Sequence, residues 1–173
     1  GRWQWLVLLA ASMVFYLAGG LQALVWLLAV IAVTWAAGLL LQRLNDRRSG
    51  LEKDDKAGQT VIRRKKKAVV AAACVLCFGL LYAMKYWDFT VDLLPDAVGG
   101  KLPRWDFVMP LGLSFFIFQS IGYVIDVNRE KVAAEKNLAK VTLFVCYFPQ
   151  IIQGPISFYD QLAVQLYAPH SFD

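Results

Sequence analysis

Long apolar stretches alternate with short polar ones along the chain, and most of them approach the length that a membrane requires. A helix needs about 20 apolar residues to cross about 30 Å of hydrocarbon, at about 1.5 Å per residue. The pattern predicts transmembrane spans over residues 3–18, 21–41, 68–87 and 108–125. Because only Gly19 and Gly20 separate the first two spans, we expect a tight reversal that makes these spans a transmembrane hairpin.

A fifth apolar segment, residues 139–153, is too short to cross the bilayer comfortably as a helix. Pro149 and Pro155 each lack an amide donor and resist helix continuation. Interrupted backbone is tolerated at membrane depth only where protein buries it or a water-filled cavity adjoins it. We therefore predict a broken or re-entrant helix from Pro149 to Pro155, beside a cavity that Gln150 and Gln153 help to line. An ordinary helix that ends before the first proline is the alternative.

The composition favours a membrane protein over a soluble domain. Of the 173 residues, 58% are hydrophobic and 18% are charged, whereas globular domains contain about 45–50% apolar residues. The predicted fold class is all-α, a polytopic transmembrane helical bundle that forms a single membrane domain over residues 1–173. Because the chain starts with Gly1 and stops at Asp173 without a closing helix, we expect it to be a fragment of a larger membrane domain. With three Cys and one His, we expect no metal site.

The charge distribution predicts the orientation in the membrane. More than half of the 18 Lys and Arg residues fall in residues 43–67, which we expect to form a basic loop on the cytoplasmic side. Residues 88–106 are more acidic than basic and should face outward, and residues 127–140 should return to the cytoplasm. This alternation predicts a multi-pass protein of the cytoplasmic (inner) membrane. Since no aromatic residues interleave with the basic ones, we expect the lipid bilayer as partner and no nucleic acid.

A polar stripe runs along the predicted helix at residues 108–125. Its members recur at spacings of three and four residues and therefore share one helix face. They are Gly112, Phe116, Gln119, Tyr123 and Asp126. Gln and Asp are costly against lipid, so this face should meet protein or water. Two interpretations stay open, namely packing between helices and the lining of a pathway.

Two motifs give a more specific indication. Residues 109–129 read MPLGLSFFIFQSIGYVIDVNR, and residues 147–156 read YFPQIIQGPI. In order and separation they resemble two signatures of the membrane-bound O-acyltransferase family, P-x-G-[IL]-S-F-x-x-F-Q-x-x-x-Y-x-I-D-V-x-R and F-F-P-Q-L-x-x-G-P-I. The resemblance is to the bacterial polysaccharide branch, which includes the alginate O-acetylation membrane subunit. Asn128 departs from the family, which often has Tyr at that place.

The resemblance implies a membrane O-acyltransferase acting in the cell envelope. Such an enzyme moves an acyl group, here expected to be acetyl, from a cytoplasmic thioester donor to hydroxyls of an extracytoplasmic polysaccharide through a tunnel. The donor would be acetyl-CoA or another acyl thioester, with no bound cofactor, and an extracytoplasmic acetyltransferase is the expected protein partner. The family's essential histidine lies beyond an element like the one at Pro169 to Asp173, so we expect no catalytic residue in this chain and assign none to His170.

The candidate site residues come from the two motifs and would line a tunnel or substrate path. They are Ser114, Gln119, Tyr123, Asp126, Arg129, Pro149, Gln150, Gln153, Gly154 and Pro155. Two alternatives remain. A secondary transporter or flippase would also use a discontinuous helix, although such proteins usually carry a matching repeat, and none is visible here. A non-catalytic scaffold subunit could use the polar stripe to dock a partner.

Overall fold

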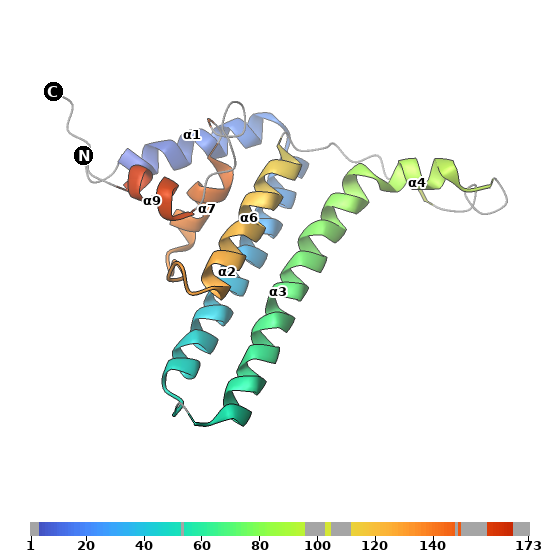
Figure 1. Ribbon diagram of the computed structural model, residues 1–173. Helices are drawn as coiled ribbons and strands as arrows, with labels where there is room; N and C mark the ends of the chain where they lie inside the picture. Colours follow the sequence, from blue (N-terminus) through green and yellow to red (C-terminus); the bar gives the residue numbers. More distant parts are fainter. Residues whose placement is uncertain are drawn as a thin grey trace.

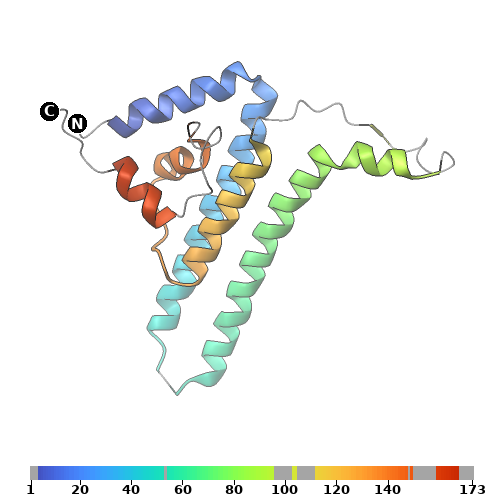
Figure 2. The same ribbon diagram turned by 45° about the horizontal axis from the view of Figure 1, so that its top comes forward.

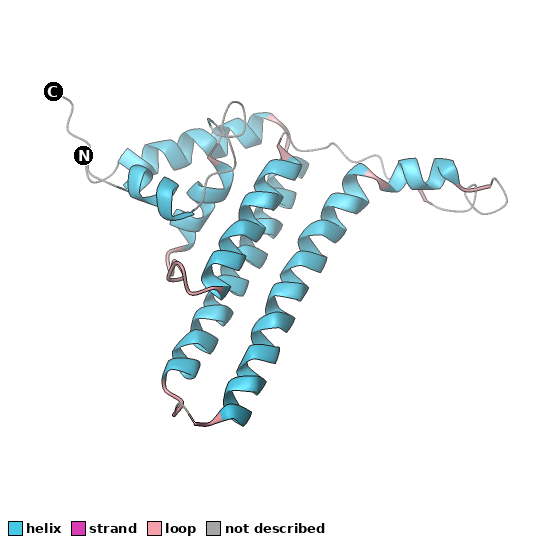
Figure 3. Cartoon of the chain, viewed as in Figure 1, coloured by secondary structure: helices cyan, strands magenta, loops and turns pink. Residues whose placement is uncertain are grey.

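The computed structural model describes residues 4–52, 54–95, 103–104, 112–147, 149 and 159–167, and within them it contains helices and loops but no strands (Figure 3). The helices are α1 (Gln4–Ala18), α2 (Leu21–Ser49), α3 (Lys56–Lys85), α4 (Trp87–Leu93), α6 (Leu113–Asn128), α7 (Leu138–Cys146) and α9 (Tyr159–Tyr167). This confirms the all-α fold class that the hydropathy pattern predicts.

Helices α2 and α3 form a long antiparallel pair, and α6 packs alongside both of them (Figure 1). Among the described residues, α2 and α3 are the helices long and apolar enough to cross a membrane. They have 29 and 30 residues, which corresponds to about 44 Å each and exceeds the hydrocarbon thickness of about 30 Å. Their polar ends therefore extend beyond the apolar layer.

The connection between α2 and α3 is much shorter than the basic loop predicted over residues 43–67. Helix α2 continues to Ser49 and α3 already starts at Lys56, so most of the basic residues lie on helix ends. Asp55 caps α3 by accepting a 2.9 Å hydrogen bond from the Gly58 amide, and Lys and Arg are good helix formers. The polar part of α3 is about 18 Å long as far as Lys67.

Helix α1 does not form the predicted transmembrane hairpin with α2. It lies across the end of α2 and covers α7 instead (Figure 2). The φ of 112° at Gly20 permits the sharp change of direction. With 15 residues, α1 reaches only about 22 Å and is too short to span alone. Its apolar residues pack on neighbouring helices instead of running parallel to α2.

Helix α7 is short and almost completely enclosed by α1, α2, α6 and α9. Every residue from Leu143 to Cys146 is at most 1% exposed. The helix ends at Cys146, before Pro149, which fits both the predicted interruption and the alternative of an ordinary helix that ends before the first proline. Pro149 itself is exposed. Residues 150–158, on which the predicted re-entrant path and its cavity depend, lie outside the described residues.

Many large apolar side chains on the outer helix faces are exposed. Examples on α2 and α3 are Val25, Leu28, Val75 and Leu76, with exposed fractions of 46–71%. Soluble monomers rarely expose contiguous apolar surface of this kind. Together with the two long apolar helices, this surface fits a protein that is embedded in a membrane.

Candidate functional site

The polar stripe of α6 points into the protein. The helix starts after Gly112, whose φ of 75° lies in the left-handed region that glycine adopts at little cost. Phe116, Gln119, Tyr123 and Asp126 are each at most 5% exposed. The stripe therefore meets protein along its whole length, as the cost of placing Gln and Asp against lipid requires.

Gln119 connects the stripe to the interrupted helix α7. Its Nε2 donates a 2.9 Å hydrogen bond to the carbonyl oxygen of Phe144 in the buried core. Phe144 lies in the last turn of α7, where backbone carbonyls have no partner within the helix. The Gln119 side chain thus satisfies a carbonyl that the early end of α7 leaves free. This hydrogen bond ties the first sequence motif to α7, the helix that ends directly before the second motif.

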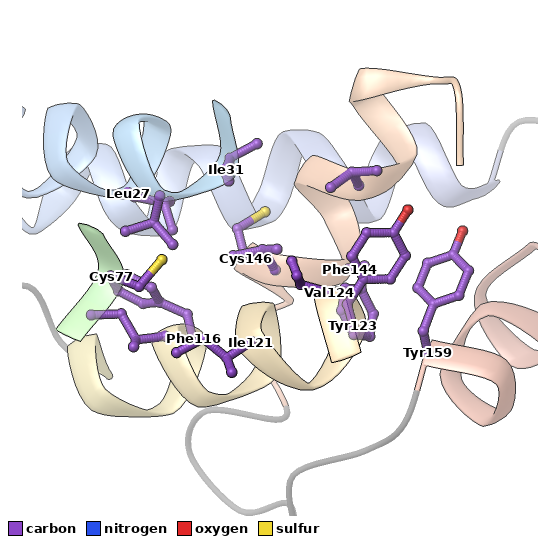
Figure 4. Close-up of a cluster of buried hydrophobic side chains, with 14 of the residues drawn as sticks. Leu27, Ile31, Cys77, Phe116, Ile121, Tyr123, Val124, Phe144, Cys146 and Tyr159 are labelled. Carbon is purple, nitrogen blue, oxygen red and sulfur yellow. The ribbon is translucent and has the colours of Figure 1, made fainter. Parts of the chain in front are cut away.

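Tyr123 packs in an aromatic cluster with Phe144 of α7 and Tyr159 of α9 (Figure 4). The ring centroids are 4.9–6.0 Å apart, a separation at which aromatic pairs attract each other. On the other side, a Cβ at Gly38 of α2 would be only 3.1 Å from the Tyr123 ring. Glycine at this position therefore lets Tyr123 approach the α2 backbone.

The connection between α6 and α7, residues 129–137, is held by side chains from several helices. The Tyr123 hydroxyl accepts a 2.8 Å hydrogen bond from the Glu135 amide. Gln42 accepts one from the Ala134 amide at 3.0 Å, and Trp35 donates one to the Lys136 carbonyl at 3.2 Å. Asn45, 9% exposed, donates to the Val127 carbonyl at the end of α6 at 2.9 Å. Two residues of α2 thus fix the path of this connection, and a third holds the end of α6 before it.

Glu130 joins the same connection to the basic ends of α2 and α3. Its carboxylate oxygen Oε1 is 2.9 Å from both Arg48 and Lys66. Lys66 is buried, with its side chain 8% exposed. The hydrogen bond from Lys66, together with the positive charges of Lys66 and Arg48, lowers the pKa of the Glu130 carboxyl. Glu130 also has a φ of 63°, which costs a non-glycine residue about 1–2 kcal/mol, so the ion pairs offset a strained backbone.

Asp126 is buried at the end of the stripe. Its Oδ2 is 4.0 Å from the Lys131 ammonium and has no hydrogen-bond partner among the described residues. Lys131 makes a closer pair, 3.0 Å, with the half-exposed Asp160 of α9. A buried carboxylate with an incomplete set of partners is unusual in a structural role, because desolvation of the charge costs several kcal/mol.

A basic cleft of about 640 Å³ lies between the polar ends of α2, α3 and α6. We use the name basic cleft for its described lining residues, none of which is acidic. They are Arg48, Lys56, Gln59, Thr60, Arg63, Lys66, Lys67 and Asn128. Glu130 pairs with Arg48 and Lys66, which leaves the positive charges of Lys56, Arg63 and Lys67 available to an anion.

Curated proteins similar to this chain carry the name of alginate O-acetylases. The chain is 32% identical to "Probable alginate O-acetylase AlgI" of Azotobacter vinelandii over 99% of its own length and 32% of that protein. It is 30% identical to the protein of the same name from Pseudomonas syringae pv. tomato over 95% of the chain and 30% of that protein. A third, from Pseudomonas fluorescens, is 45% identical over 34% of the chain and 12% of that protein.

The chain thus bears out the predicted resemblance to the membrane-bound O-acyltransferase family. It spans about a third of the length of the curated relatives that it matches. No family model matches the chain. No solved structure matches it either.

The structure brings some of the candidate residues together. Gln119, Tyr123 and Asp126 lie buried on one face, as described above. Ser114 is half-buried on the same helix, and Arg129 is exposed just after it, outside the buried stripe. Pro149 is exposed. Four further candidates fall outside the described residues, namely Gln150, Gln153, Gly154 and Pro155.

Several residues that hold the acyltransferase motif in place were not among the candidates. Asn45, Gln42 and Glu130 contact the end of α6 or the connection after it. For Asn45 the sequence contained a usable signal. Gly38, Leu41 and Asn45 follow helical spacing, which continues the buried face of α2 beyond its apolar span and predicts that Asn45 is buried. Glu130 had no comparable signal, since its partners lie on two distant helices.

Proposed function

We propose that this chain is part of a membrane O-acyltransferase that moves an acyl group, acetyl by preference, from a cytoplasmic thioester to hydroxyls of an extracytoplasmic polysaccharide. The observation that carries the proposal is the match of nearly the whole chain to proteins named as alginate O-acetylases. The contact between Gln119 and Phe144 adds support, because it ties the first motif to the helix that leads into the second. The proposed location is the inner membrane, which the protein crosses several times.

The proposed donor is acetyl-CoA or another acyl thioester, and the basic cleft is where an anionic donor would approach. Lys56, Arg63 and Lys67, which form no ion pair with another described residue, would attract its phosphate groups. The connection after α6 lies on the same side as these basic helix ends, since Glu130 bridges to them. The positive-inside rule assigns this side to the cytoplasm. The proposed partner on the opposite side is an extracytoplasmic acetyltransferase, which would receive the acyl group or act with this protein on the polysaccharide acceptor.

The proposed acyl transfer is tested in cells that lack the gene and are complemented with the full-length protein. The measurement is the O-acetyl content of the envelope polysaccharide, with the protein level determined by immunoblot. We expect deletion to abolish O-acetylation and the wild-type gene to restore it. Unchanged O-acetylation after deletion would contradict the proposal.

The buried Asp126 is tested in the same cells with a matched control. Asp126→Asn keeps the shape and removes the charge, and Asp160→Asn removes the other carboxylate that pairs with Lys131. If Asp126 belongs to the substrate path, O-acetylation falls at least tenfold in Asp126→Asn and stays near wild type in Asp160→Asn. Equal O-acetyl content in both variants, at a normal protein level, would show that Asp126 is not part of the substrate path.

The donor site is tested by steady-state kinetics on the purified full-length protein. If the basic cleft receives acetyl-CoA, Arg63→Gln and Lys67→Gln raise KM for the donor with little change in kcat. Arg64→Gln is the control, because Arg64 neighbours both positions in sequence but does not line the cleft. A KM that responds equally to all three substitutions would indicate general electrostatic attraction instead of a site.

A further inference from the structure

A second groove lies between α2 and α3, with a lining that differs from that of the basic cleft. It has a volume of about 410 Å³ and combines three cations with an apolar floor. The cations are Arg43, Arg47 and Lys65, and Leu40, Leu44 and Val69 are among the floor residues. None of the described lining residues is acidic. We call it the amphipathic groove.

The lining follows from helical spacing on both helices. On α2 the lining residues recur at spacings of three and four from Leu40 to Arg47, so they occupy one face. On α3, Lys65 and Val69 are four residues apart and face the same groove. Lys66, by contrast, faces the protein and pairs with Glu130. The adjacent residues Lys65 and Lys66 thus face different surroundings, the amphipathic groove and the protein interior.

The three cations of the amphipathic groove have no partner in the described protein. Neither Arg43, Arg47 nor Lys65 makes an ion pair or a side-chain hydrogen bond with a described residue. Asp46, the nearest acid in sequence, accepts a 2.8 Å hydrogen bond from Gln42 on another part of the helix surface. The groove therefore offers three positive charges to a ligand.

The position of the groove along the helices matches the boundary between hydrocarbon and headgroups. Arg43 follows the apolar span that ends at Leu41 by two residues, and Lys65 precedes the span that begins at Ala68 by three. These offsets correspond to about 3 Å and about 4.5 Å along the helix axis. The headgroup layer is about 5–8 Å thick on each side of the bilayer. Arg43 and Lys65 thus lie at headgroup depth, and Leu40 and Val69 lie within the apolar spans. Arg47, about 9 Å beyond Leu41 along the helix, lies at the outer edge of the headgroup layer.

We infer that the amphipathic groove binds one anionic phospholipid of the cytoplasmic leaflet. Its phosphate would lie among Arg43, Arg47 and Lys65, and an acyl chain would lie along Leu40, Leu44 and Val69. The cations lie directly beside the apolar floor, so a lipid can contact the cations with its phosphate and the floor with an acyl chain. A soluble phosphate has no apolar part that could bind to the floor, so the groove favours a lipid. This inference does not depend on the proposed acyltransferase activity.

The test is native mass spectrometry of the full-length protein in a neutral detergent, with phosphatidylglycerol or phosphatidylcholine added at a low molar ratio. We expect one phosphatidylglycerol to be retained in preference to phosphatidylcholine. The triple variant Arg43→Gln/Arg47→Gln/Lys65→Gln should weaken phosphatidylglycerol binding on the order of 100-fold, since each cation at the surface contributes about fivefold. The floor variant Leu44→Asn/Val69→Asn should weaken the binding of both lipids.

A second triple variant serves as the matched control. Lys56→Gln/Arg63→Gln/Lys67→Gln removes the same net charge from the basic cleft and should leave phosphatidylglycerol binding within about twofold of wild type. Equal losses in the two triple variants would overturn the inference in favour of diffuse surface charge. Displacement of the lipid by millimolar glycerol 3-phosphate would overturn it in favour of a soluble anion. If the first triple variant does not fold, the single substitutions at Arg43 and Arg47 decide, with about fivefold loss each expected.

Discussion

The hydrogen bond from Gln119 to the Phe144 carbonyl is expected to hold the end of α7 in place. Gln119→Leu keeps the side-chain volume but removes the donor, so the carbonyl stays buried without this bond. A buried polar group that loses its partner costs about 1–3 kcal/mol, and side-chain hydrogen bonds in membrane proteins contribute about 0.6–1.7 kcal/mol. We therefore expect a loss of about 1–2 kcal/mol in the free energy of unfolding, measured in mixed detergent micelles.

Thiol labelling gives a local readout of the same substitution. Cys146 ends α7 and is fully buried, whereas the buried Cys77 lies on α3, away from the hydrogen bond. Loosening of α7 should speed maleimide labelling of Cys146 about 5- to 30-fold, the population change that corresponds to about 1–2 kcal/mol, and leave Cys77 unchanged. Phe118→Leu, a change on the half-exposed side of α6, is the control. Wild-type stability and Cys146 labelling in Gln119→Leu would refute the reasoning.

Gln119→Glu adds a pH-dependent version of this experiment. A protonated carboxyl can donate to the Phe144 carbonyl, but an ionised one cannot. The variant should thus keep the hydrogen bond at low pH, where the carboxyl is protonated, and lose it as the pH rises. The difference from wild type should therefore be smallest near pH 4 and grow toward pH 7. A difference that is independent of pH would argue against the hydrogen bond.

Two further predictions concern the surroundings of the motif. The lowered pKa of Glu130 contributes stability above its ordinary pKa of 4.5 that is lost as the pH falls through the folded-state value. Glu130→Gln should thus lower the free energy of unfolding by less than about 1 kcal/mol at pH 7, since the carboxylate is half exposed, and the difference should vanish in thermal unfolding near pH 3. Gly38→Leu should lower the free energy of unfolding by more than about 2 kcal/mol through overpacking against Tyr123. Gly79→Leu is the control, because Gly79 faces open space and the substitution should not destabilise the protein. Equal melting temperatures of the two variants would contradict the close approach of Tyr123 to the α2 backbone.

The sequence alone determined the helical class, the membrane character and the buried face of α6. These features depend on local periodicity and on the free energy of transferring each residue type into lipid, both of which can be computed from neighbouring residues. The two prolines also limited how far a helix could extend from residue 139, and α7 ends before Pro149. The two motifs, which resemble the acyltransferase signatures, also identified the family correctly.

Only the tertiary structure decided how these elements are placed. The crossing of α1 over the end of α2 and the pairing of Glu130 with both Arg48 and Lys66 depend on contacts between residues far apart in the chain. Gln119 illustrates the division. Its spacing predicted burial, but its partner, the Phe144 carbonyl, is a backbone group of another helix that no side-chain pattern encodes. Such contacts are set by the packing of whole helices, which the local sequence constrains only weakly.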